Sequence, residues 1–347
     1  MLPDEGSVKD HPSTDGTLRS EVPPAPAARF GERSGHAPPS PLPVRVLEFV
    51  RFSHTIFALP FALIGFFIGL FYKQYGEIPF AGRPTGIFEE KNFPSITSPS
   101  TLTLFLLVLG CMVTARSAAM AFNRYLDRKY DALNPRTAIR EIPKGIITPG
   151  NALAFTIVNC ILFIAFTWFI NPICFYLSPV ALAVVLGYSY TKRFTPLCHL
   201  VLGVGLSLAP IGAFLSVTGY FSLLPILLSL AVLTWVSGFD IIYALQDVEF
   251  DQSQQLYSIP AWLGKPKALM FSSTLHLLSS AFVIAAGLYG GFGIWYWIGV
   301  AVFIGMLIYQ HSIVKPNDLS RVNLAFMTAN GIASVVFMVF VLADLFF

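Results

Sequence analysis

The chain has 347 residues, of which 55% are hydrophobic and only 12% are charged. Soluble domains carry about 25% charged residues, so this composition predicts a polytopic membrane protein and excludes a large soluble domain. The net charge is only +3, and no basic stripe is interleaved with aromatic residues, which excludes a nucleic-acid-binding protein.

The chain divides into an N-terminal tail and a long apolar region. Residues 1–43 are rich in Pro, Ser, Gly and Ala and lack the apolar run of a signal peptide, so we expect a disordered tail. Residues 44–347 contain nine stretches long enough to cross a bilayer as helices. These stretches are residues 44–72, 101–126, 149–170, 173–191, 198–218, 222–246, 267–289, 294–314 and 321–346. The predicted fold is therefore all-α, a bundle of transmembrane helices.

The first stretch carries a basic residue near its start. Arg51 is followed by Ser53, His54 and a long apolar run. The arginine either anchors the helix at the membrane boundary or binds the carboxylate of an acidic substrate.

The second stretch ends in an acidic cluster. Asn123, Asp127 and Asp131 stand four residues apart, so their side-chain oxygens lie along one face of a helix. Arg116 shares that face and lies about 16 Å inside Asp127 along the helix axis. At that depth we expect its guanidinium to face a polar cavity, where it either pairs with a protein carboxylate or contacts a substrate.

Basic residues follow the second stretch and close the fourth. Arg140 lies in the connection after the second stretch, and Lys192 and Arg193 come directly after the fourth, which also contains Tyr188. These cations either set the topology or neutralise an anion such as a diphosphate.

The sixth stretch ends in a second acidic cluster. Asp240 and Asp247 are seven residues apart and face the same way on a helix, and Asp251 follows one turn later. Tyr243 lies between them and is either a hydrogen-bond partner of a metal ligand or an interfacial aromatic. Several carboxylates directed at one place near a bilayer are costly unless they share bound cations. Paired sets of oxygen ligands suit Mg²⁺ bridged to a diphosphate.

The charges of the connections predict the orientation. Lys and Arg concentrate in the connections that follow the second, fourth, sixth and eighth stretches, whereas the opposite side holds only three, all in residues 73–100. This bias predicts a cytoplasmic N-terminus and places both acidic clusters on the cytoplasmic face. The four cysteines form no Cys-x-x-Cys pair and the six histidines show no ligand spacing, so neither a disulfide framework nor a zinc site is predicted.

Three motifs resemble a known family. The run from Asn123 to Asp131, Asn-x-x-x-Asp-x-x-x-Asp, resembles the first signature of UbiA-type intramembrane prenyltransferases. The run from Asp240 to Asp251, Asp-x-x-Tyr-Ala-x-x-Asp-x-x-x-Asp, resembles the second. Residues 188–192, Tyr-x-x-x-Lys, are similar to the family's shorter motif after the fourth helix, and residues 50–60 and 134–137 resemble its bacterial 4-hydroxybenzoate polyprenyltransferase-like branch.

The resemblance implies a helical bundle around a central cavity and an enzyme that depends on Mg²⁺. It would transfer a polyprenyl group from a polyprenyl diphosphate to a small aromatic acid of the 4-hydroxybenzoate type in quinone biosynthesis. The alternative acceptor is a 1,4-dihydroxynaphthoate of menaquinone biosynthesis. The resemblance also implies the inner membrane of a bacterium, an active site facing the cytoplasm, and no protein partner. A transporter that uses intramembrane carboxylates is the alternative from a different class, but charges clustered at one end of the helices favour the enzyme.

The resemblance also implies roles for individual residues. The predicted catalytic carboxylates are Asp127, Asp131, Asp240, Asp247 and Asp251. The predicted holders of the Mg²⁺-diphosphate are Asn123, Asp127, Asp131, Asp247 and Asp251. The predicted substrate contacts are Asn123, Lys192, Arg193 and Arg140 toward the diphosphate, with Tyr188, Tyr243, Arg116 and Arg51 beside them. We expect Asp240 to line the acceptor pocket and Arg51 or Arg116 to bind the acceptor's carboxylate, with Asp240 as the rival partner of these arginines.

Overall fold

The computed structural model describes residues 57–76 and 99–347. Expectations about the N-terminal tail, Arg51 and the connection at 77–98 lie outside the described residues. The described residues all belong to one compact unit. That unit is helical, with only one isolated β-bridge and no strand among the residues it describes.

The helices match the predicted stretches closely. They are α2 (Leu59–Tyr75), α3 (Pro99–Leu133), α4 (Pro149–Ile170), α5 (Pro172–Thr191), α6 (Cys198–Thr218), α7 (Leu223–Ala244), α8 (Val248–Ser253), α9 (Ile259–Leu263), α10 (Lys265–Gly290), α11 (Ile294–Ile313) and α12 (Asn330–Phe346). Within the described part of the chain, eight helical segments have the length and hydropathy of a membrane span, and α2 is a shorter apolar helix of 17 residues. The predicted all-α membrane bundle is confirmed.

Two helix starts follow directly from capping residues. Thr148 precedes α4, and its hydroxyl accepts a hydrogen bond from the Asn151 amide at 3.2 Å. Asn171 precedes α5, and its side chain accepts one from the Cys174 amide at 2.9 Å. In both helices a proline occupies the first turn, where its missing N–H costs no helical hydrogen bond.

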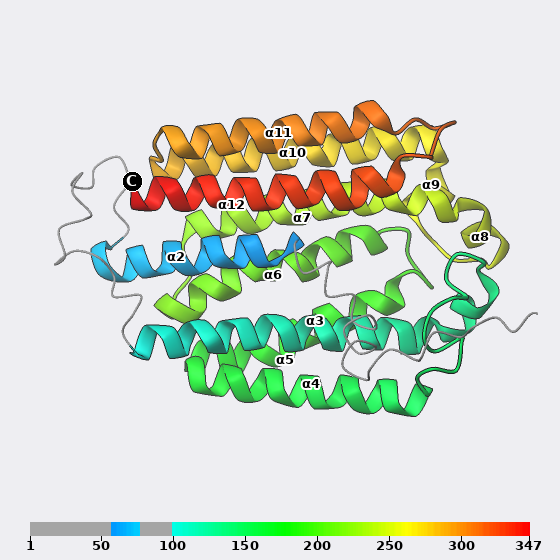
Figure 1. Ribbon diagram of the computed structural model, residues 1–347, viewed down its shortest axis with the longest axis horizontal. Coiled ribbons are helices and arrows are strands. Elements are labelled where there is room, and N and C mark those ends of the chain that lie inside the picture. The colour runs from blue at the N-terminus through cyan, green and yellow to red at the C-terminus, as the bar shows by residue number, and fades with distance from the viewer. Residues whose placement is uncertain (1–56, 77–98) are drawn as a thin grey trace, which may run out of the picture. The chain divides into compact units, whose positions relative to one another are not determined.

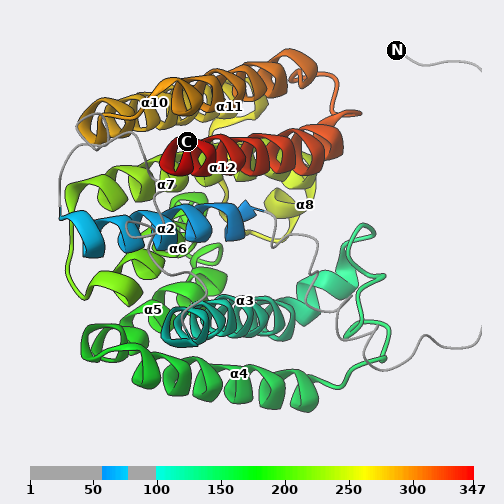
Figure 2. The same ribbon diagram turned by 60° about the vertical axis from the view of Figure 1, so that its left-hand side comes forward.

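The helices gather around α6 and α7. Helix α7 packs against α6 and α10, α2 packs against α6 and α12, and α3 packs against α4 and α5. Figures 1 and 2 show α7 with α10, α11 and α12 on one side, α3, α4 and α5 on the other, and α2 and α6 between them. Successive long helices alternate in direction, so the C-terminal ends of α3, α5 and α7 meet at the end of the bundle that also carries α8 and α9 (Figure 1).

The closest approach of α2 to α6 requires glycine at position 65. A Cβ atom at Gly65 would lie 2.1 Å from the carbonyl oxygen of Pro210. No side chain fits there, so glycine permits the two backbones to approach.

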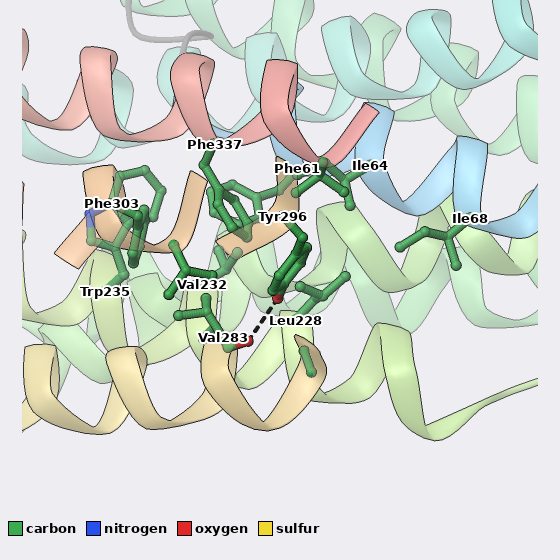
Figure 3. Close-up of a cluster of buried hydrophobic side chains, with 14 of the residues drawn as sticks. Phe61, Ile64, Ile68, Leu228, Val232, Trp235, Val283, Tyr296, Phe303 and Phe337 are labelled. Atoms are coloured by element: carbon green, nitrogen blue, oxygen red, sulfur yellow. Dashed lines mark hydrogen bonds between the residues drawn. The ribbon is translucent and has the colours of Figure 1, made fainter. Parts of the chain in front are cut away.

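Away from that end, the bundle has a dry aromatic core, shown in Figure 3. Trp235, Tyr296, Phe303 and Phe337 are fully buried there. The Tyr296 hydroxyl donates to the Val283 carbonyl at 2.7 Å, which satisfies a polar group that burial would otherwise leave unpaired.

The second acidic cluster does not lie on one continuous helix, contrary to the sequence expectation. Helix α7 ends at Ala244, residues Leu245–Asp247 form a 3₁₀ turn, and α8 begins at Val248. A 3₁₀ turn has three residues per turn instead of 3.6, so it rotates the residues that follow out of the α-helical register. Asp251 therefore leaves the face that carries Asp240.

Candidate active site

A pocket of about 250 Å³ lies where α3, α5 and α7 end. Its lining brings together residues from both acidic clusters and from the basic segments. The charged residues that line it are Asp127, Asp131, Asp240, Asp247, Arg136, Arg140, Lys192 and Arg193. Asn123, Tyr188 and Tyr243 also line it. Because four carboxylates face four basic side chains, the pocket is balanced in charge before any ligand enters.

On the α3 side, Asp127 is held between an amide and a guanidinium. The Asn123 side chain donates to Asp127 Oδ2 at 3.0 Å, and Arg193 Nη2 donates to Asp127 Oδ1 at 2.7 Å. Arg193 also donates to the Ser189 carbonyl at 2.8 Å, which ties its side chain to the end of α5. The predicted neighbours Asn123, Asp127 and Arg193 thus meet in one place.

The connection after α3 folds back onto that helix. Arg140 Nη1 donates to both carboxylate oxygens of Asp131, at 2.8 and 2.9 Å. Beneath it, Arg124 forms a buried ion pair with Glu141. Two ion pairs therefore fix the connection over the end of α3, where it forms one wall of the pocket.

On the α7 side, Asp247 receives a bidentate guanidinium. Arg136 Nε donates to Oδ1 at 3.0 Å and Nη2 donates to Oδ2 at 2.6 Å, while Nη1 reaches the Tyr243 hydroxyl at 3.0 Å. Burial favours a lower pKa for Arg136, but the charge and hydrogen bonds of Asp247 outweigh it and raise the pKa overall. Sequence patterns do not identify Arg136 as a site residue, because its partner lies 111 positions away.

Asp251 lies behind the pocket and does not line it. Its side chain is 0% exposed, and it pairs with Lys192 Nζ at 2.7 Å and accepts a hydrogen bond from the Ser258 hydroxyl at 2.9 Å. Burial favours a lower pKa for Lys192, but Asp251 raises it overall, so the ammonium stays charged. Lys192 therefore faces the pocket while its charge is anchored from behind.

Asp240 differs from the other pocket carboxylates in its partner. Its Oδ2 lies 2.6 Å from Nδ1 of His199, the second residue of α6. Asp240 lies seven residues before Asp247 on α7 and its 3₁₀ extension, about 10 Å farther from the helix end. Tyr188, which also lines the pocket, lies within electrostatic range of both Asp240 and Asp127. Sequence analysis did not identify His199.

Arg116 does not line the pocket. Its Nε has no hydrogen-bond partner, and none of the ion pairs in the described part of the chain involves it. Arg116 lies within electrostatic range of Tyr188, which does line the pocket. The rival partner expected for Arg116 was Asp240, but Asp240 pairs with His199 instead.

The donor set suits a hard cation held jointly with a ligand. Within the described residues, no group of three or more His, Cys, Asp or Glu side chains converges as a complete metal site. Mg²⁺ usually takes one or two protein carboxylates and completes its shell with water and phosphate oxygens. The amide oxygen of Asn123 and the carboxylates of Asp127 and Asp247 are hard oxygen donors in one pocket, so they fit this incomplete kind of site.

Known proteins are similar to this chain in sequence. The model of the UbiA prenyltransferase family matches residues 94–335. The 4-hydroxybenzoate octaprenyltransferase of Nitrosomonas europaea is 30% identical over 248 residues, which span 72% of this chain and 84% of that protein. The protein of the same name from Aeromonas salmonicida is 29% identical over 244 residues, which span 70% of this chain and 84% of that protein.

Solved structures agree in fold. The apo structure of a UbiA homolog from Aeropyrum pernix K1 has a TM-score of 0.65 at 29% identity and covers 84% of this chain and 96% of that one. A UbiA homolog from Archaeoglobus fulgidus, bound to DMAPP and Mg²⁺, has a TM-score of 0.65 at 19% identity and covers 87% and 99%. The family resemblance of the motifs is confirmed: this chain belongs to the UbiA prenyltransferase family and is a prenyltransferase.

Proposed function

We propose that this enzyme transfers a prenyl group from a prenyl diphosphate to a ring carbon of a small aromatic acid of the 4-hydroxybenzoate type. The names of the curated relatives support the acceptor, since several are 4-hydroxybenzoate octaprenyltransferases. The Archaeoglobus fulgidus homolog bound to DMAPP and Mg²⁺ supports the donor. The observation that carries the proposal is the pocket itself, in which acidic and basic side chains alternate at one end of an apolar bundle.

The outer end of this pocket suits a metal-bound diphosphate. Asn123, Asp127 and Asp247 would hold Mg²⁺, with Asp131 close by, and the metal would neutralise charge on the leaving diphosphate. Asp251 would act indirectly, because it fixes the Lys192 ammonium from behind. A balanced set of acids and bases accepts a metal–diphosphate assembly of small net charge with little electrostatic cost.

The basic side chains would stabilise the departing diphosphate. Arg136, Arg140 and Arg193 each already donate hydrogen bonds to a carboxylate oxygen at the pocket wall. Guanidinium groups present several fixed donors, so each can keep its carboxylate and also donate to a diphosphate oxygen. Charge that develops on the leaving group then meets preorganised donors, which lowers the barrier to ionisation.

The acceptor's carboxylate would bind an unpaired arginine. Arg116 has no acidic partner in the described part of the chain, and a buried guanidinium requires an anion to offset its desolvation. Arg51 is the second candidate. An acceptor held deeper than Asp127 would present its ring to the allylic carbon while apolar walls exclude water from the cation.

The charges of the connections support an orientation for the pocket. We propose that the pocket faces the cytoplasm of a bacterial inner membrane, because Lys and Arg concentrate at the end of the bundle that carries it. The prenyl chain would extend from the pocket between apolar helices toward lipid.

Product analysis tests the proposal. Purified protein in lipid nanodiscs is given farnesyl diphosphate, Mg²⁺ and one acceptor at a time: 4-hydroxybenzoate, 1,4-dihydroxy-6-naphthoate, or a phenol without a carboxylate. Mass spectrometry is expected to find a C-prenylated acid with one of the first two and at most traces with the third. Efficient prenylation of the phenol, or no transfer to any aromatic acid, would contradict the proposed acceptor class.

A further inference from the structure

The pocket carboxylates have two kinds of partner. Asp127, Asp131 and Asp247 each pair with an arginine, whose guanidinium stays protonated at every pH a protein tolerates. Asp240 pairs with the imidazole of His199, at 2.6 Å. An arginine partner keeps a carboxylate ionised and anchored, whereas an imidazole leaves the carboxylate able to accept a proton.

The His199 ring contacts Asp240 at the wall of the pocket and is almost completely buried. Its side chain is only 4% exposed, while that of Asp240 is 24% exposed. The ring lies next to the Cys198 thiol, and its Nε2 has no hydrogen-bond partner within the described residues. Since an ionised carboxylate only accepts hydrogen bonds, Nδ1 carries the hydrogen that points to Asp240 Oδ2.

Close packing between α6 and α7 fixes the position of His199. The Ser237 hydroxyl donates to the His199 carbonyl at 3.1 Å, one turn before Asp240. A Cβ at Gly203 would lie 2.5 Å from the Leu233 carbonyl oxygen, so the two helices approach as closely as glycine allows. The imidazole therefore meets Asp240 from a rigid element and can hold it in one rotamer.

We propose that His199 is a positioning residue that holds the Asp240 carboxylate so that its other oxygen accepts the hydroxyl proton of the aromatic acceptor. This inference rests on the proposed function and assigns the acceptor's proton to a specific pair of residues. It gives His199 a role that neither the motifs nor the family comparison assigns.

The acceptor loses its hydroxyl proton before it attacks the prenyl donor. The acceptor's O–H bond breaks, its proton moves to Asp240, and the electron pair stays on the acceptor oxygen. The ring carbon next to the hydroxyl-bearing carbon then forms the new C–C bond with the allylic carbon, while the C–O bond to diphosphate breaks and leaves its pair on the diphosphate. The ring C–H proton moves to the acceptor oxygen, which restores the phenol, and Asp240 releases its proton to water.

Two substitutions distinguish the effect of the His199 hydrogen bond from the effect of its side-chain volume. His199→Asn places an amide donor where Nδ1 stands, and His199→Leu removes the donor while it keeps the volume. We expect His199→Leu to lower kcat by about 10- to 100-fold, since general acid–base contributions are about 100-fold or more. His199→Asn should keep kcat within about threefold of wild type, because the hydrogen bond to Asp240 is retained. KM for the prenyl diphosphate should not change in either variant.

The acidity of the acceptor's hydroxyl group should change the effect of the His199→Leu substitution on kcat, which a purely structural role of His199 does not predict. With 3-fluoro-4-hydroxybenzoate, whose hydroxyl is more acidic, the ratio of wild-type to His199→Leu kcat should shrink. His276→Asn is the matched control, because His276 is equally buried, on α10, and pairs with His311 away from the pocket.

Each outcome decides the matter. Three results would overturn the inference if the wild type remains active. They are a kcat ratio that does not depend on acceptor acidity, a His199→Asn variant as slow as His199→Leu, and an equal rise in KM for both substrates. A wild-type protein that prenylates no aromatic acid would overturn the proposed function and the inference together.

Discussion

Helix α7 and its extension contain two regions with opposite surroundings. From Leu224 to Phe239 the helix is buried among apolar and aromatic side chains, including those in Figure 3. From Asp240 to Asp251 the chain carries three aspartates, and each has a charged or titratable partner on another element. The first region holds the bundle together by packing, and the second gathers charge at one end. Packing and charged side chains are therefore separated along this part of the chain, and substitutions in the two regions should have different effects.

The largest effect expected is the loss of catalytic activity when carboxylates of the pocket are substituted. Asp127→Asn and Asp247→Asn should each lower kcat/KM by about 100- to 1000-fold, because each removes a carboxylate that would hold the Mg²⁺, and the metal would neutralise the departing diphosphate. Thermal unfolding in detergent should stay close to wild type, since asparagine keeps the shape of the side chain. Glu249→Gln is the control: Glu249 pairs with Lys265 on the exterior, so its activity should be unchanged. Equal losses in the control would remove the distinction between the pocket and its surroundings.

Substitutions in the apolar region are expected to lower the stability of the protein without lowering its catalytic activity. Leu228 is fully buried in the core shown in Figure 3, far along α7 from Asp240. Leu228→Ala should destabilise the protein by about 2–5 kcal/mol, because the cavity removes packing contacts. Turnover per folded molecule should remain near wild type. A variant with the wild-type melting temperature but slow turnover would show that the apolar region also contributes to catalysis.

A smaller effect, on the KM of one substrate only, is expected from Arg116, whose charge lies within an apolar length of helix. Arg116→Leu should raise KM for the aromatic acid by about 10- to 100-fold, the cost of one charged hydrogen-bonded contact, and leave KM for the prenyl diphosphate unchanged. Steady-state kinetics with each substrate varied in turn measures both constants. If both constants rise together, Arg116 is a structural residue and the carboxylate binds elsewhere.

The sequence predicts the helices well where local chemistry marks their ends. The Thr148 and Asn171 caps, each followed by proline, place the starts of α4 and α5 to within a residue. Hydrophobic length alone places the remaining spans, because a bilayer-crossing helix requires a continuous apolar run.

Local irregularities escape the same reasoning. The 3₁₀ turn at Leu245–Asp247 and the π-helical turn at Leu324–Ala329 interrupt runs that look uniformly helical. The π turn is accompanied by Asn330, whose amide donates to the carbonyls of Ala325 and Phe326 at 3.2 and 2.9 Å. Such turns depend on tertiary partners, which apolar periodicity does not report.

The sequence predicts which residues belong to the site but not which residues they contact. Asn123, Asp127 and Asp247 follow from their spacing at the ends of two helices, and the structure brings all three to one pocket. Their partners do not follow, because Arg136 lies 111 residues from Asp247 and His199 lies 41 residues from Asp240. Only the antiparallel packing of α6 and α7, and the folding of the connection after α3, bring these groups together.

Binding of an unreactive donor would show whether the acidic end of the bundle binds a prenyl diphosphate through a metal. Farnesyl S-thiolodiphosphate is titrated into wild-type protein by calorimetry, with Mg²⁺ and then with EDTA, and into Asp127→Asn. We expect saturable binding with Mg²⁺, and at least about tenfold weaker binding both with EDTA and in the variant, which corresponds to about 1.4 kcal/mol or more. The same Kd in all three experiments would show that the diphosphate binds without the metal and away from the α3 carboxylates, and would rule out the proposed metal-dependent site.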